Sequence, residues 1–283
     1  MRYFDLDFPP EEKYPIPINP VIFYEKPLGL DIIPVIFIKK RLFERISADS
    51  ISLLAQKVYR LVSNICLSIY QTPSSTQFDC DWTEKTRKKY FLFLQAYRSV
   101  CHSGLSCTVR LHQVKYPAMV GIPPVDYGVL MFYNMGEIDA GPNSSVYEKS
   151  IAEKYSPAIK TYPLDMDLAL PIFTWALQLR EGRVVQLLNK MSFAHFENDS
   201  NFNRISTSRY EVRHFCFLGG YYFREGDSVK IEHVREDDLI NICDQVNQYT
   251  NHKIRNLIFY DLDRRNLSLY EKDIFEKLRS RTD

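Results

Sequence analysis

Short apolar runs alternate with amphipathic stretches along most of this sequence. The apolar runs are rich in β-branched and aromatic residues, and they cover residues 2–8, 32–39, 76–82, 105–113, 128–135, 168–179 and 255–263. Between them, apolar residues recur at helical spacing. This alternation is typical of βα units built around a parallel sheet. The sequence therefore predicts an α/β fold.

Two of the amphipathic stretches are the clearest helices. Residues 47–70 place Leu54, Val58 and Ile65 on one face, with Ser47 or Asp49 available as the N-cap. Residues 83–100 repeat aromatic and aliphatic residues in the same way. We expect further helices at residues 146–155, 236–249 and 270–279.

Two regions interrupt the alternation. Residues 11–30 are rich in proline, which predicts a long ordered loop after the first strand. Residues from about 184 to 234 contain β-rich segments separated by Gly219-Gly220 and by Glu225-Gly226-Asp227, which predicts antiparallel hairpins. We interpret residues 1–283 as a single domain with a β-hairpin insertion at about 184–234.

The composition excludes several classes of protein. The chain has 45% hydrophobic residues, and its 36 Lys and Arg nearly balance its 35 Asp and Glu, so no overall charge attracts it to nucleic acid. No apolar stretch approaches the roughly 20 residues of a membrane helix, and the N-terminal residues lack the pattern of a signal peptide. The six cysteines form no CxxC pair and have no zinc-type spacing. We expect a soluble chain without a cofactor or metal.

Several predicted strands end in polar residues spaced two apart, which share one face of a strand. These are Asp5 and Asp7, Asp79 and Asp81, Arg110 and His112, and Asp261 and Asp263, while Tyr133 and Asn134 end another strand. In a parallel barrel the carboxyl ends of all strands open on one mouth. We therefore expect these side chains to gather at one site.

A structural interpretation competes with the functional one for each residue. An aspartate after a strand is often a helix cap or a turn former, which applies to Asp261 and Asp5. It applies less to Asp79 and Asp81, because Thr83 is available as the cap of the next helix. His112 fits a structural histidine as well as a catalytic one, and Trp175 fits the core better than a sugar platform.

Two segments resemble family 18 glycoside hydrolases, the chitinase-like TIM barrels. Residues 77–99 resemble the strand and helix that carry that family's Asp-x-x-Asp-x-Asp-x-Glu signature, and Asp79 and Asp81 match its last two aspartates. Residues 130–135 resemble the family's Met-x-Tyr-Asp strand, aligned on Met131, Tyr133 and Asn134. The resemblance implies a TIM (β/α)8-type barrel.

The same resemblance implies that the first βα unit is missing, because the predicted strands match the second to the eighth of the barrel. Met1 would then be an internal start, and localisation stays open: an upstream segment could export the protein or attach it to the cell envelope. The chain is still more similar to uncharacterised bacterial glycoside-hydrolase-like TIM-barrel proteins, which share phrases such as FDxDW and RLHQVKY. That resemblance covers most of the chain and assigns no activity.

The sequence departs from the family at the residue that matters most for hydrolysis. The family's general acid is the final Glu of the signature, and here that position is Thr83, while the first signature Asp falls at Thr76. Two neighbouring carboxylates can supply an acid and a base, since like charges raise the pKa of one of them. We therefore assign Asp81 as the acid and Asp79 as the residue that orients it.

The remaining candidates are assigned around this pair. Asp261 or Asp5 would act as the base or nucleophile, with Tyr133 and Asn134 placing the sugar. Arg110, His112 and Trp175 complete the expected substrate-binding set.

The sequence allows three functional interpretations. The first is a glycoside-hydrolase-like protein that acts on or binds a carbohydrate at the barrel mouth. The second is a non-catalytic carbohydrate-binding or interaction barrel, which Thr83 favours. The third is a metal-dependent hydrolase that uses Asp79, Asp81 and His112, although the metal-binding spacings HxH and HExxH are absent. The expected partner is a carbohydrate rather than nucleic acid, and the oligomeric state stays open.

Overall fold

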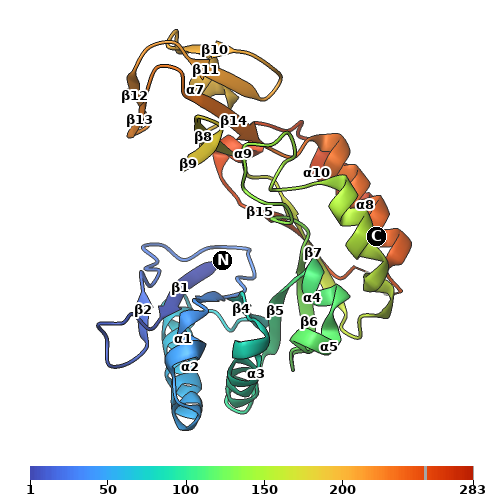
Figure 1. Ribbon diagram of the computed structural model, residues 1–283. Helices are drawn as coiled ribbons and strands as arrows, with labels where there is room; N and C mark the ends of the chain where they lie inside the picture. The colour runs from blue at the N-terminus through green and yellow to red at the C-terminus, as the bar shows by residue number, and fades with distance from the viewer. Residues whose placement is uncertain (252–253, 283) are drawn as a thin grey trace. The chain divides into compact units, whose positions relative to one another are not determined.

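The computed structural model describes residues 1–251 and 254–282, and it divides into two compact units. The first unit comprises residues 1–130 and 161–167, and the second comprises residues 131–160 and 168–283. Figure 1 shows the strands and helices of both. No helix among the described residues combines the length and the apolar character needed to cross a membrane.

The first unit is built from βα repeats. Its strands are β1 (Arg2–Asp7), β2 (Ile16–Ile18), β3 (Val35–Ile38), β4 (Ser75–Cys80), β5 (Gly104–Arg110) and β6 (Tyr127–Met131, whose last residue belongs to the second unit). Its α-helices are α1 (Arg41–Arg45), α2 (Ile51–Ser68), α3 (Glu84–Arg98), α4 (Leu111–Lys115) and α5 (Pro117–Val120), and a 3-10 turn at Ala48–Ser50 precedes α2. Strand and helix alternate here as the sequence pattern predicts.

The main sheet is mostly parallel. Its hydrogen-bonded order is β15-β7-β6-β5-β4-β3-β1-β2. The pairs β1–β3, β3–β4, β4–β5 and β7–β15 are parallel, whereas β2 pairs with β1 in the antiparallel direction at one edge. Eight strands in a mixed α/β arrangement of this kind are consistent with a TIM-like barrel fold.

Helices pack against one face of the first unit's sheet. Phe78 of β4 is fully buried, and its ring lies 5.1 Å from that of Phe93 and 4.7 Å from that of Tyr97, both on α3. Figure 1 shows α2 and α3 side by side beneath these strands. Because side chains alternate along a strand, the neighbouring residues Asp79 and Gln77 point to the other face, where they are partly exposed.

The second unit combines short helices with an antiparallel sheet. Its helices are α6 (Lys149–Tyr155), α7 (Phe193–Glu197), α8 (Glu236–Tyr249), α9 (Arg264–Leu267) and α10 (Ile274–Thr282), with a 3-10 turn at Ser156–Thr161 whose last residue belongs to the first unit. Its strands are β7 (Met166–Pro171, which begins in the first unit), β8 (Trp175–Arg180), β9 (Arg183–Asn189), β10 (Phe202–Arg204), β11 (Arg209–Val212), β12 (Cys216–Leu218), β13 (Tyr221–Phe223), β14 (Ser228–Glu232) and β15 (Leu257–Tyr260).

Five of these strands form an antiparallel sheet with the order β10-β11-β14-β8-β9, and β12 and β13 form a separate hairpin. The rings of Phe196, Phe202, Tyr210 and Phe223 fill the core of this sheet.

The structure divides one predicted strand into two. The run at 168–179 is two strands rather than one, because β7 ends at Pro171 and β8 begins at Trp175. β7 pairs in parallel with β15, whereas β8 pairs with β14 and β9 in the antiparallel sheet. Both strands are buried, so the apolar run continues through the break.

Candidate functional site

The first candidate cluster lies on the partly exposed face of the first unit's sheet, at the carboxyl ends of its strands. Backbone register aligns Asp5 of β1 with Phe37 of β3, and Phe37 with Asp79 of β4. Thr108 of β5 is next to this row, and its hydroxyl donates a hydrogen bond of 2.7 Å to Asp79 Oδ1. Parallel pairing thus brings two of the predicted aspartates into one lateral row.

Asp79 is the most perturbed carboxyl group of this cluster. Burial raises its pKa above the usual value, and the neighbouring charge of Asp81 raises it further. The hydrogen bond from Thr108 and the charges of Arg110 and Arg2 act in the opposite direction without cancelling the shift. A carboxyl group in this setting holds its proton to a higher pH than a surface aspartate does.

Asp81 has a different environment, although it follows Asp79 by only two residues. Its Oδ1 accepts a 2.6 Å hydrogen bond from Nε of Arg110, and half of its side chain is exposed. A hydrogen bond between a guanidinium and a carboxylate is charge-assisted, so it fixes the orientation of the Asp81 side chain. The two carboxyl groups therefore differ in their surroundings: Asp79 accepts from Thr108 and has a raised pKa, whereas Asp81 accepts from Arg110 and is half exposed.

Asp5 pairs with a residue that sequence reasoning did not single out. A register shift in β1 between Arg2 and Phe4 places Arg2 on the same face as Asp5, and Arg2 Nε donates a 2.5 Å hydrogen bond to Asp5 Oδ1. The guanidinium also lies 4.6 Å from the centre of the Phe37 ring. A bulge cannot be deduced from residue alternation alone, so the sequence contains no signal for this contact.

His112 is not on the strand that ends at Arg110. We expected both residues on one face of a strand over 105–113, but β5 ends at Arg110 and His112 lies in the first turn of α4, where its side chain is exposed. Gln113 closes this turn, because its side-chain oxygen accepts the backbone N–H of Arg110 at 2.9 Å. Desolvation of the ring by the surrounding protein, reinforced by the charge of Arg110, lowers the pKa of His112 even though the side chain reaches solvent.

The second candidate cluster belongs to the second unit and consists of four aromatic rings. The rings of Tyr133 and Tyr260 stack with 5.6 Å between centroids and an angle of 3° between planes. Phe173 meets both rings edge-on at 5.8 and 5.9 Å, and it lies 5.2 Å from the ring of Trp175. We call Tyr133, Phe173, Trp175 and Tyr260 the aromatic cluster.

The aromatic cluster stands at strand ends. Tyr133 follows β6, Phe173 follows β7, and Tyr260 is the last residue of β15. Tyr133 is buried, whereas Tyr260, which stacks on it, exposes 47% of its surface. Phe173 and Tyr260 were missed by sequence reasoning, and their place at the polar ends of apolar runs is the signal that could have identified them.

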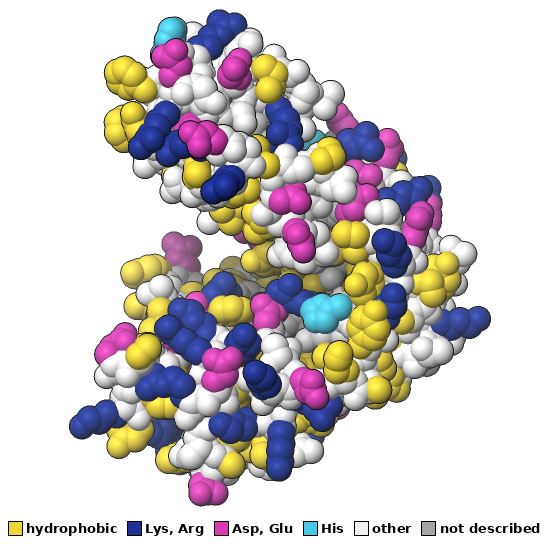
Figure 2. All heavy atoms as spheres, viewed as in Figure 1, with side chains coloured by type: hydrophobic (Ala, Val, Ile, Leu, Met, Phe, Trp, Pro, Cys, Tyr) yellow, Lys and Arg dark blue, Asp and Glu magenta, His cyan; other side chains and the backbone are white. Residues whose placement is uncertain are grey.

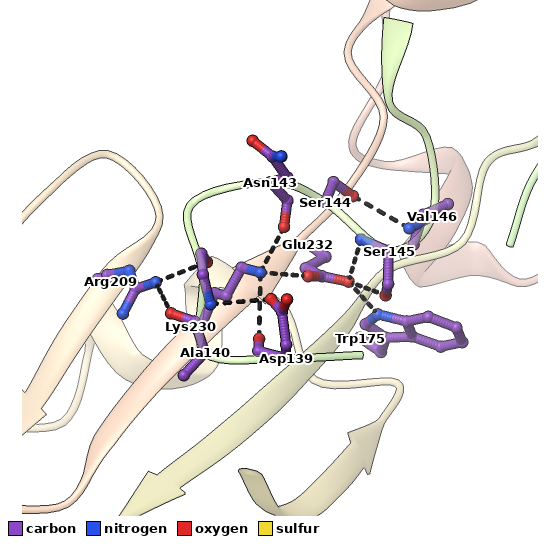
Figure 3. Close-up of polar contacts among 11 residues, drawn as sticks. Asp139, Ala140, Asn143, Ser144, Ser145, Val146, Trp175, Arg209, Lys230 and Glu232 are labelled. Atoms are coloured by element: carbon purple, nitrogen blue, oxygen red, sulfur yellow. Dashed lines mark hydrogen bonds and ion pairs between the residues drawn. The ribbon is translucent and has the colours of Figure 1, made fainter. Parts of the chain in front are cut away.

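Trp175 is anchored by a buried charged pair (Figure 3). Its indole N–H donates a 2.9 Å hydrogen bond to Glu232 Oε2, which also accepts the backbone N–H of Ser145 at 3.1 Å. Glu232 Oε1 lies 2.7 Å from Nζ of Lys230, and both charged side chains are at least 96% buried. Lys230 also donates to the carbonyl oxygen of Asn143 at 2.5 Å. Sequence reasoning did not single out Glu232, because nothing in its local pattern marks its partners.

The other predicted residues of the second unit have the following surroundings. The Asp261 carboxylate accepts a 2.5 Å hydrogen bond from Asn266, which is buried. Asp263 caps α9 by accepting the backbone N–H of Arg265 at 2.9 Å. Asn134 is exposed and has a positive φ of 52°, which asparagine tolerates better than most residues. No group of three or more His, Cys, Asp or Glu among the described residues could hold a metal ion.

Comparisons with solved structures show what this fold is similar to. The spore cortex-lytic enzyme SleL of Bacillus cereus matches 89% of this chain with a TM-score of 0.53 and 13% sequence identity, and the chain spans 60% of that protein. The putative sporulation-specific glycosylase ydhD of Bacillus subtilis matches 77% of this chain and 78% of its own length, with a TM-score of 0.50 and 13% identity. The fold of this chain is similar to the folds of these two proteins.

The barrel-like α/β fold is the part of the expected resemblance that these comparisons support. No protein family model matches the sequence. No curated protein matches it either. A sequence identity of 13% to these two structures shows a similar fold only. Activity and ligand must therefore be inferred from the residues of this chain.

Proposed function

We propose that this glycoside-hydrolase-like protein binds a carbohydrate at the carboxyl ends of its barrel strands, with the aromatic cluster as the contact surface. The observation that carries the proposal is the stacked pair Tyr133 and Tyr260, with nearly half of Tyr260 exposed. A sugar ring presents C–H groups on its flat faces, and a fixed aromatic face with a polar rim is suited to receive it.

A second candidate function is hydrolysis by the first cluster. It is favoured by the contrast between Asp79, whose pKa is raised by burial, and Asp81, which is half exposed and hydrogen-bonded to Arg110. Paired carboxyl groups with opposed protonation are the chemical requirement of a glycosidase. These surroundings favour Asp79 as the proton donor and Asp81 as the base. The sequence suggested Asp81 as the acid, with Asp79 orienting it and Asp261 or Asp5 as the base or nucleophile.

Binding without turnover is the alternative, and Thr83 supports it. Thr83 stands where family 18 enzymes would have the acid, and here it is the N-cap of α3, with its backbone N–H 2.9 Å from Oγ1 of Thr86. A threonine hydroxyl is too weak an acid to protonate a leaving oxygen. Any hydrolysis must therefore use other carboxyl groups.

The test of binding uses Tyr260→Ala, with Tyr222→Ala as a matched control. Tyr222 exposes 42% of its surface in the same unit, but it belongs to the β12–β13 hairpin. Each variant is titrated with soluble oligosaccharides that carry or lack acetamido groups. Losing one aromatic contact should weaken binding by roughly ten-fold in Tyr260→Ala and leave Tyr222→Ala unchanged. Equal affinities in both variants, or no binding by the unmodified chain, would reject this site.

The test of hydrolysis compares product release by the unmodified chain with Asp79→Asn and Asp81→Asn. Loss of turnover in both variants, with oligosaccharide affinity retained, would support the acid–base pair. Turnover that survives both substitutions would exclude it. Binding without product from the unmodified chain would assign the protein to the non-catalytic class.

A further inference from the structure

Positive charge is concentrated on three helices of the first unit. Together α1, α2 and α3 contain nine Lys and Arg against two Glu, whereas the whole chain is nearly balanced at 36 against 35. The rest of the chain therefore carries an excess of carboxylates. Figure 2 shows Lys and Arg side chains gathered over the part of the molecule where Figure 1 places these helices.

The outward stripe of α2 mixes cations with leucines. Leu53, Lys57, Arg60 and Leu67 are separated by four, three and seven residues, so they lie along one side of the helix. All four are exposed, and Leu53 and Leu67 expose 55% and 68% of their surfaces. The buried stripe of the same helix faces the sheet, as Val58 and Val62 show.

α3 repeats this pattern beside α2. Lys85, Lys88 and Leu92 follow at intervals of three and four residues, and all three are exposed, with Leu92 at 39%. The two helices are in contact through the rings of Tyr59 and Tyr97, whose centroids lie 6.0 Å apart. We call Leu53, Lys57, Arg60, Leu67, Lys85, Lys88 and Leu92 the basic face.

The cations of the basic face are not compensated within the described part of the chain. Neither Lys57, Arg60, Lys85 nor Lys88 forms an ion pair with a described carboxylate. Other cations of the same helices do have partners, since Arg98 lies 2.9 Å from Asp126. The exposed cations of the basic face therefore carry charge that no described carboxylate offsets.

We propose that the basic face is a docking surface for an anionic phospholipid bilayer. Cations near such a surface gain electrostatic attraction, and apolar side chains between them can enter the boundary between headgroups and acyl chains. The exposed leucines favour a lipid surface over a nucleic acid, because nucleic acids are held by charge, hydrogen bonds and aromatic stacking. This inference is independent of carbohydrate binding.

The test is co-sedimentation of the full chain with vesicles of phosphatidylcholine mixed with phosphatidylglycerol, and with vesicles of phosphatidylcholine alone. We expect binding to the anionic vesicles only, weakened by added salt. Each cation near an anionic surface increases partitioning onto the membrane roughly five-fold. Replacing four cations by Gln should therefore reduce vesicle binding by more than about 100-fold, and the four are Lys57, Arg60, Lys85 and Lys88.

A matched control removes the same charge elsewhere. Lys160, Arg264, Lys272 and Arg279 are exposed in the second unit, and changing all four to Gln alters the net charge equally. This control should retain binding, while Leu53→Gln with Leu92→Gln should weaken it. The eight affected cations are on the surface, and circular dichroism with urea unfolding confirms that each variant folds.

Several outcomes would overturn the proposal. Equal loss in the two charge variants would show a response to net charge rather than to the basic face. Equal binding to both vesicle types, or no vesicle binding by the unmodified chain, would contradict electrostatic docking of the basic face. Retention on duplex DNA that depends on the same four cations, without vesicle binding, would assign the surface to a nucleic acid instead.

Discussion

Replacing Asp7 by Asn is expected to destabilise the first unit strongly, although Asp5 on the same strand should tolerate the same change. The Asp7 side chain is 2% exposed. Its carboxylate accepts a 2.6 Å hydrogen bond from Arg41 Nε and a 2.7 Å bond from the backbone N–H of Phe8, and it lies 2.9 Å from Nζ of Lys39. A neutral amide at this position could not balance the two cations.

The expected magnitude follows from burial. Removing one partner of a buried ion pair costs about 3–5 kcal/mol, and we expect about 3 kcal/mol because Arg41 and Lys39 are 43% and 40% exposed and so can regain hydration. The Arg2–Asp5 pair is more exposed, at 53% and 21%. Asp5→Asn should therefore cost no more than about 1 kcal/mol.

The stability difference between the unmodified chain and Asp7→Asn should depend on pH. The Arg41 guanidinium, against the opposing effect of burial, holds the pKa of Asp7 well below its usual range. A depressed folded-state pKa contributes stability above the unfolded pKa of about 3.9 and loses that contribution as the pH falls below it. The gap between the unmodified chain and Asp7→Asn should therefore be full at pH 7 and shrink on acidification below about pH 4.

The assay is urea unfolding followed by tryptophan emission. The chain has two tryptophans, so a Trp175→Phe background leaves only Trp82, which is buried in the same unit as Asp7. With a slope of about 2 kcal/mol per molar urea, the midpoint should fall by about 1.5 M. A change below about 1 kcal/mol, or an equal loss in Asp5→Asn, would refute the reasoning.

Two further substitutions test the candidate sites. Asp79→Asn should stabilise the first unit at neutral pH. The raised folded-state pKa of Asp79 gives the unmodified chain a contribution to stability that is full below the unfolded pKa and is lost as the pH rises, whereas asparagine does not titrate. Urea unfolding should therefore show the gain vanish below about pH 4. Glu232→Gln should shift Trp175 emission in a Trp82→Phe background, whereas Asp227→Asn, which alters another buried carboxylate next to that sheet, should leave the emission unchanged. Equal shifts in both variants would contradict the anchoring role.

Much of the fold could be predicted because its signals are local. The helix predicted over 236–249 matches α8 at both ends, and the strand predicted over 2–8 matches β1 to within one residue. Such segments combine clear periodicity with caps or breakers. The junction between β7 and β8 could not be predicted in this way, because a buried parallel strand and a buried antiparallel strand have the same continuous apolar sequence pattern. Pro171 was the available signal.

The candidate site was less predictable, because it depends on contacts between distant segments. Sequence alternation placed Asp79 on the opposite face of its strand from its apolar neighbours, and the burial pattern of β4 has Asp79 partly exposed between buried Phe78 and Cys80. Alternation also placed His112 beside Arg110, which is wrong because a helical turn begins at Leu111. The stacking of Tyr133 on Tyr260 joins residues 127 positions apart in the chain, and no local pattern encodes such a contact.

The short strand β2 has a consequence for how the protein behaves in concentrated solution. An open sheet edge can recruit the matching edge of another molecule and start intermolecular aggregation. β2 has only three residues, and its central residue, Pro17, lies opposite Leu6 and has no N–H to offer to an incoming chain. This edge of the sheet is therefore a poor template for a further strand, which guards the molecule against self-association from that side.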